Sequence, residues 1–78
     1  MKIEVFGTGC AKCERLERNV LNALTEKGMD ADVEKVTDPD EMVSKGIMMT
    51  PALMIDGELV VAGRVATIKE INDILDGL

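Results

Sequence analysis

The chain lacks histidine, tryptophan and tyrosine, and Phe6 is its one aromatic residue. The core of these 78 residues must therefore be aliphatic, with six methionines available to fill irregular gaps. Because histidine is absent, a carboxylate or water must accept a proton that is released at a functional site. Together these absences narrow the acid–base chemistry that the chain can perform.

The sequence also lacks a long hydrophobic run and an excess of positive charge. No apolar stretch approaches the ~18 residues of a membrane span, and no signal peptide precedes Lys2. The net charge of −6 argues against nucleic acid and an anionic membrane surface as partners, and solubility alone explains it. We expect one cytoplasmic domain, residues 1–78, and nothing requires more than a monomer.

Cysteine is scarce, and its spacing is informative. Cys10 and Cys13 are the two cysteines, two residues apart, where a short apolar strand meets an amphipathic helix. A pair this close cannot connect distant segments, which argues against a structural disulfide framework. In a reducing compartment such a pair is more often catalytic or metal-binding than structural.

Hydrophobic periodicity and turn residues predict the element order β-α-β-α-β-β-α. The second helix begins at a capping box of Asp38 and Glu41, and the third at a capping box of Thr67 and Glu70. Gly28 and Gly46 end the first two helices, and Asp56-Gly57 is a strong signal for a two-residue hairpin. The predicted strands are 3–6, 29–36, 52–55 and 58–62, and the helices begin at 11, 39 and 68.

This order predicts an α/β fold with one mixed four-stranded sheet flanked by three helices. The first two strands are joined through a helix and should be parallel with a right-handed crossover. The last two strands form an antiparallel hairpin. Helices are expected on both faces of the sheet.

Four motifs together resemble the thioredoxin superfamily. They are Val5-Phe6-Gly7-Thr8-Gly9-Cys10-Ala11-Lys12-Cys13, Thr50-Pro51, Asp56-Gly57-Glu58-Leu59 and Gly63-Arg64-Val65. The chain is most similar to the small redox-active disulfide proteins of archaea and bacteria. The resemblance implies a thioredoxin-like βαβαββα fold, client proteins with disulfides, a disulfide reductase as electron donor, and no cofactor.

The resemblance also implies roles for the Thr-Pro pair. It implies that Pro51 is cis and lies beside the disulfide, while the backbone of Thr50 pairs with an extended substrate. The chain departs from thioredoxin, which has tryptophan where Gly9 stands and Gly-Pro in place of Ala11-Lys12. It departs from glutaredoxins at Ala62-Gly63-Arg64, where those proteins carry a Gly-Gly and an acidic residue for glutathione.

The position of each cysteine indicates its role. Cys10 is expected at a helix N-terminus, where orphan N–H groups and the helix dipole stabilise a thiolate, and Lys12 adds a nearby cation. Cys13 lies about one turn further on the apolar stripe and should be more buried. Cys10 would therefore attack a client disulfide, and Cys13 would resolve the mixed disulfide.

Other candidate residues have a functional and a structural interpretation. Glu4 precedes Cys10 by six residues, where thioredoxin has a buried proton acceptor, but we favour a position at the sheet margin. Met48 and Met49 could form an adaptable client surface, although ordinary packing is the simpler interpretation. Lys12 is equally a solvated helix residue or a client contact. Gly9 and Gly63 serve backbone geometry, and Gly63 could also admit a client strand.

Two alternative functions stay open. The Gly-Thr-Gly-Cys-Ala-Lys-Cys stretch superficially resembles the loop of copper and heavy-metal-associated domains, and two thiolates suit Cu(I) or Zn(II). Those domains end on a strand, whereas this chain ends on an amphipathic helix. A structural zinc site also needs four ligands, so a metal would require a second molecule. In the other alternative, the oxidised pair only regulates association of a binding module.

Overall fold

The elements follow the order expected from the sequence in the computed structural model, which describes residues 1–8 and 11–78. The strands are β1 (Lys2–Phe6), β2 (Asp32–Val36), β3 (Ala52–Ile55) and β4 (Glu58–Ala62). The helices are α1 (Ala11–Lys27), α2 (Pro39–Ser44) and α3 (Ile68–Asp76).

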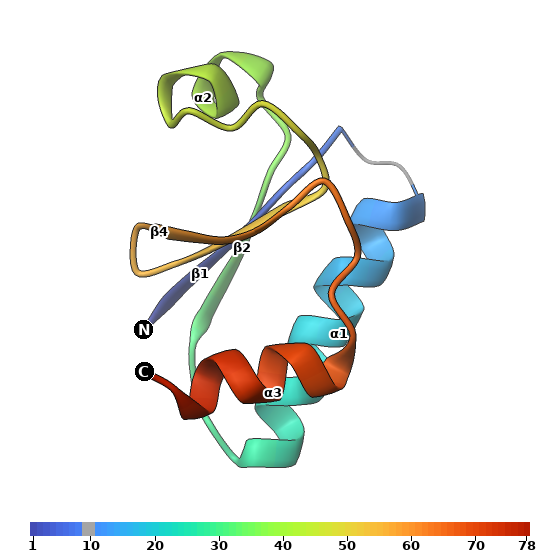
Figure 1. Ribbon diagram of the computed structural model, residues 1–78, viewed down its shortest axis with the longest axis vertical. Coiled ribbons are helices and arrows are strands. Elements are labelled where there is room, and N and C mark those ends of the chain that lie inside the picture. Colours follow the sequence, from blue (N-terminus) through green and yellow to red (C-terminus); the bar gives the residue numbers. More distant parts are fainter. Residues whose placement is uncertain (9–10) are drawn as a thin grey trace.

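One mixed sheet in the order β2-β1-β3-β4 forms the middle layer, as predicted. β1 and β2 are parallel, whereas β3 pairs antiparallel with both β1 and β4. Figure 1 shows α1 and α3 on one face of this sheet and α2 on the other. The sheet therefore separates two apolar layers, and β1 lies between them in its interior.

The larger core lies between the sheet and the α1–α3 pair. The apolar stripe predicted for α1 is buried there, with Leu16 and Val20 fully inaccessible. Ile3 and Val5 meet this layer from β1. A smaller cluster lies under α2 and consists of Phe6, Val36, Met42, Ile47, Ala52 and Met54.

Three local features have the conformation that the sequence predicts. Asp56 and Gly57 have φ values of 50° and 85°, the left-handed pair that a two-residue hairpin requires. The capping box of Thr67 and Glu70 is formed at the start of α3. Gly46, which follows the C-cap residue Lys45 of α2, has a φ of 74°.

Two local predictions are wrong. Asp38 caps α2 by accepting the N–H of Asp40 at 2.9 Å, one residue earlier than the capping box with Glu41 requires. The second strand begins at Asp32 and not at Met29, because Met29 completes the C-terminal cap of α1. Its N–H donates to the carbonyl of Leu24 at 3.0 Å.

Candidate functional site

Cys13 lies in the first turn of α1 with its side chain fully buried, as its place on the apolar stripe predicts. Its predicted partner Cys10, together with Gly9, lies outside the described residues. The roles expected of Cys10 and Gly9 therefore stay predictions. Cys13 and the elements around it make up the described part of the site.

Gly7 touches Cys13 so closely that no side chain fits between them. A Cβ added to Gly7 would lie 1.9 Å from the Sγ of Cys13 and 2.8 Å from its Cβ. The N–H of Gly7 donates to the carbonyl of Val36 at 3.0 Å, which fixes the end of β1 against β2. The side chain of Cys13 thus occupies the space that a side chain at position 7 would need. The sequence predicts only a turn at Gly7, and no local pattern signals this contact.

Pro51 lies at the same end of the sheet. Phe6 pairs with Ala52 in the antiparallel register of β1 and β3, so the next residues, Gly7 and Pro51, are neighbours across the two strands. The Thr50–Pro51 peptide bond is cis, and the carbonyl of Pro51 accepts the N–H of Gly63 at 2.9 Å. The sheet register therefore brings together Pro51, Gly7 and the sulfur that packs on Gly7.

Two methionines precede the Thr-Pro pair and are strongly exposed. Met48 is 90% exposed and Met49 is 61% exposed. The side chain of Met49 lies over Gly63, where an added Cβ would be 2.9 Å from the methionine methyl group. Gly63 also has a φ of 79°, which favours glycine. The sequence candidates Met49, Thr50 and Gly63 therefore form one continuous surface beside Pro51.

Glu4 is buried, and our preference for the sheet margin is wrong. Only 6% of the surface of Glu4 is exposed, and its Oε2 accepts a hydrogen bond from Lys45 Nζ at 2.8 Å. Lys45 lies at the end of α2, with Nζ 5.5 Å from the centre of the Phe6 ring. The hydrogen bond to Glu4 raises the pKa of Lys45 above its ordinary value. Buried charge is tolerated here because it is paired.

The strand alternation places Glu4 on the α2 side. Ile3 and Val5 contribute to the core with α1, and Phe6 packs under α2, so Glu4 shares the face of Phe6. Cys13 belongs to α1 on the other face of the sheet. The partner Lys45 was missed by sequence analysis, because no spacing rule connects a helix end with a strand about 40 residues earlier.

Lys12 is exposed on the first turn of α1, next to Cys13. It has no ion pair with any residue in the described ranges. Its position fits both interpretations made from the sequence, a solvated helix residue and a contact for a docked partner.

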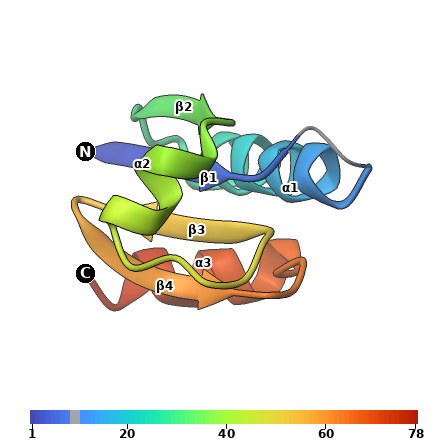
Figure 2. The same ribbon diagram turned by 90° about the horizontal axis from the view of Figure 1, so that it is seen from above.

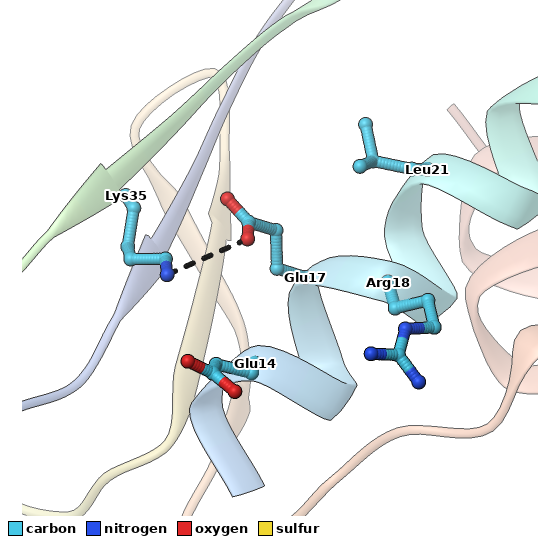
Figure 3. Close-up of a pocket in the computed structure, with 5 residues that line it drawn as sticks. All are labelled: Glu14, Glu17, Arg18, Leu21 and Lys35. Atoms are coloured by element: carbon cyan, nitrogen blue, oxygen red, sulfur yellow. Dashed lines mark ion pairs between the residues drawn. The ribbon is translucent and has the colours of Figure 1, made fainter. Parts of the chain in front are cut away.

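A hollow of about 250 Å³ between α1 and β2 lies apart from these residues. Figure 3 shows its lining of Glu14, Glu17, Arg18, Leu21 and Lys35, with an ion pair of 3.6 Å between Lys35 and Glu17. The mixed charges and the ion pair make it a solvated groove along α1. None of the sequence candidates lines it.

Residues 1–8 and 11–78 were searched for candidate metal sites and for membrane-spanning helices. No group of three or more histidine, cysteine, aspartate or glutamate side chains there could hold a metal ion. In the same ranges no helix has the length and hydropathy to cross a membrane.

Comparison with known proteins identifies the family. The model of the thioredoxin domain family matches residues 1–76. A protein named thioredoxin from Methanothermobacter thermautotrophicus is 47% identical over 75 residues, covering 96% of this chain and 97% of the relative. A second thioredoxin, from Methanocaldococcus jannaschii, is 38% identical over 71 residues, covering 91% of this chain and 81% of the relative.

The chain belongs to the thioredoxin domain family. The resemblance and the thioredoxin-like α/β fold expected from the sequence are thereby confirmed. Membership of this family supports a general role in thiol–disulfide chemistry.

Proposed function

We propose that this protein is a thiol–disulfide oxidoreductase that exchanges a Cys10–Cys13 dithiol/disulfide with the disulfides of client proteins. One observation supports this most: the buried sulfur of Cys13 packs on Gly7, whose strand neighbour is Pro51. A cysteine held at the end of a sheet beside an extended segment is suited to exchange with a docked disulfide.

The reaction has two exchange steps. The thiolate of Cys10 attacks one client sulfur; a Cys10–client bond forms, the client disulfide breaks, and the other client sulfur leaves and takes up a proton. The thiol of Cys13 then loses its proton and attacks the sulfur of Cys10. The Cys10–Cys13 bond forms, the bond between Cys10 and the client breaks, and the client sulfur that was bound to Cys10 leaves as a thiolate, which is protonated. Two electrons pass from the protein to the client, and a disulfide reductase restores the dithiol.

The proton of Cys13 needs an acceptor, and Glu4 is our candidate. Its buried carboxylate is held by Lys45 Nζ at 2.8 Å. Because Glu4 faces α2 and Cys13 belongs to α1, we propose that water at the end of the sheet carries the proton between them. The alternative is that the Glu4–Lys45 pair only fixes α2 to β1.

The client would lie on the surface formed by Met49, Thr50 and Gly63. Exposed methionines adapt to varied apolar side chains, and the glycine lets a client backbone approach. Lys12 extends the proposed surface on the side of α1 and also favours the Cys10 thiolate, and Gly9 stays a proposed client contact from the sequence alone. We further propose that the protein acts as a monomer in the reducing cytoplasm, since a dithiol couple needs reduced surroundings to be recharged.

Trapping of a mixed disulfide tests the proposal. Cys13→Ser should accumulate a covalent adduct with a cystine-containing peptide through Cys10, detected by mass spectrometry and released by dithiothreitol. The matched control Cys10→Ser should form none, because the sulfur of Cys13 is buried. Absence of an adduct with Cys13→Ser would exclude Cys10 as the nucleophile.

A redox titration separates this function from metal transport. The metal-free protein should show one reversible two-electron transition, between about −270 mV and about −180 mV. No such transition, together with retention of Cu(I) or Zn(II) through purification, would favour the metal carrier. A transition without client reduction would favour the redox-regulated binding module.

A further inference from the structure

Two cations beside the candidate site have no ionic partner among the described residues. Lys12 and Arg15 are both exposed on the first two turns of α1. Five of the nine cations form ion pairs with carboxylates, namely Lys2, Lys27, Lys35, Lys45 and Arg64. Arg18, which lines the groove of Figure 3, and the exposed Lys69 on α3 also have no ion pair among the described residues. The charges of Lys12 and Arg15 are thus available to a partner that docks at this end.

The start of α3 continues this positive surface. Asn19, one turn after Arg15 on the same side of α1, donates from Nδ2 to the carbonyl of Ala66 at 2.8 Å. Arg64 stands two residues before Ala66, with half of its side chain exposed and Nη1 2.5 Å from Glu70. We call Lys12, Arg15 and Arg64 the basic surface.

The opposite end of the molecule is acidic. Figure 2 shows the starts of α1 and α3 at one end, and both chain termini with the β3–β4 turn at the other. The lysines of the far end, Lys2 and Lys27, are ion-paired. Carboxylates gather there in the last turn of α1, the following loop, the hairpin turn and the end of α3, at Glu26, Asp30, Asp32, Asp56 and Asp76.

The acids nearer to the site lie on other sides of it. Glu14 faces β2 in the groove of Figure 3. Asp38, Asp40 and Glu41 stand at the start of α2, on the opposite face of the sheet from α1 and α3. Glu70 pairs with Arg64, but no carboxylate of the described residues forms an ion pair with Lys12 or Arg15.

Ions in solution screen distant charges, so the charges next to the site determine which partner it attracts. Lys12 and Glu26 are separated by about 21 Å along α1, from a rise of about 1.5 Å per residue. The Debye length at an ionic strength of about 0.15 M is about 8 Å. A group docking at the site is therefore exposed to Lys12 and Arg15 far more than to the acidic end. The net charge of −6 favours a basic partner, whereas the basic surface favours an acidic one.

We propose that the basic surface selects client segments in which acidic residues flank the disulfide. This inference rests on the proposed oxidoreductase function and names its substrate class. Acidic side chains next to the client disulfide would approach Lys12 and Arg15 while the disulfide approaches Cys10. The client gains attraction from charges that the folded protein leaves available.

Two synthetic peptides of equal length test this. Each carries one cystine, flanked by glutamates in the first and by lysines in the second. The reduced protein should reduce the acidic peptide about fivefold faster at about 0.05 M ionic strength, and this ratio should approach one at about 1 M. A ratio of one at low salt, or a faster basic peptide, would overturn the inference. Reduction of neither peptide would instead refute the oxidoreductase function itself.

Charge reversal locates the effect. Lys12→Glu with Arg15→Glu should invert the preference. The ratio of the two rates is the readout because a change in the Cys10 thiolate affects both peptides alike. The control Lys2→Glu with Lys27→Glu makes the same change of net charge at the far end and should keep the preference for the acidic peptide. Equal effects of both double variants would mean that the whole-molecule charge decides, and the basic surface would be rejected.

Discussion

Gly7→Ala tests the contact on which the site geometry depends. The backbone of Gly7 does not have a positive φ, so alanine meets no conformational penalty there. Its new Cβ would lie 1.9 Å from the Sγ of Cys13 and 2.8 Å from the Cβ. Rotation of the Cys13 side chain can move the sulfur but not the Cβ. Relief therefore requires the start of α1 to move away from the end of β1.

The expected cost follows from overpacking a filled site. Insertion of one methyl group into a close-packed interior typically destabilises a protein by about 1–3 kcal/mol. The usual gain from replacing glycine, about 0.4–1 kcal/mol, offsets part of this. A net loss of about 1–2 kcal/mol corresponds to a fall in Tm of about 5–15 °C for a domain of this size.

Denaturant titration of the reduced protein measures this effect. Gly77→Ala is the matched control, because its φ is −84° and the nearest atoms to an added Cβ lie at 3.6 and 3.7 Å. That control should be neutral or slightly stabilising. Displacement of α1 should also raise the rate at which a thiol reagent modifies Cys13. If Gly7→Ala is as stable as Gly77→Ala, the close approach of Gly7 to Cys13 is refuted.

Three further substitutions test the supporting contacts. Lys45→Met leaves the Glu4 carboxylate buried without its cation and should lower Tm at pH 7. Because the pKa of Lys45 is raised, its stabilisation is complete below about pH 10.5 and is lost at higher pH, where the variant and the parent should converge in thermal melts. Glu70→Gln keeps a side chain that can cap α3 but removes the ionic hydrogen bond from Arg64, which lowers the pKa of Glu70. That stabilisation is present above about pH 4.5 and is lost as the pH falls through the lowered pKa, so circular dichroism melts should differ at pH 7 and coincide at about pH 2. Gly63→Ala forces a side chain into a φ of 79° and should cost about 1–2 kcal/mol in denaturant titration; an unchanged midpoint would contradict this.

The fold was predictable because its local signals agree with one another. The stripe of α1, the Asp56-Gly57 hairpin and the capping box at Thr67 each depend on residues a few positions apart. The errors arose where neighbouring signals compete. Met29 has the alternation of a strand but completes a helix cap, and Asp38 reaches the nearer N–H of Asp40.

The site was only partly predictable, since its decisive contacts join distant segments. Burial of Cys13 follows from its helical spacing. The Glu4–Lys45 pair joins residues 41 positions apart, and the packing of Met49 on Gly63 depends on how two loops meet. No periodicity or motif encodes such distances, so the sequence suggested the residues and the structure supplied their partners.

β1 connects all of these features through its alternation. Ile3 and Val5 enter the core with α1, while Glu4 and Phe6 face α2, where Lys45 meets both of them. A slip of one residue would exchange these faces, placing a carboxylate in the aliphatic core and breaking its ion pair. It would also remove the glycine from the position where Cys13 packs. The register that buries the core therefore also sets the end of the sheet at which α1 begins, and stability and site geometry cannot be altered independently along this strand.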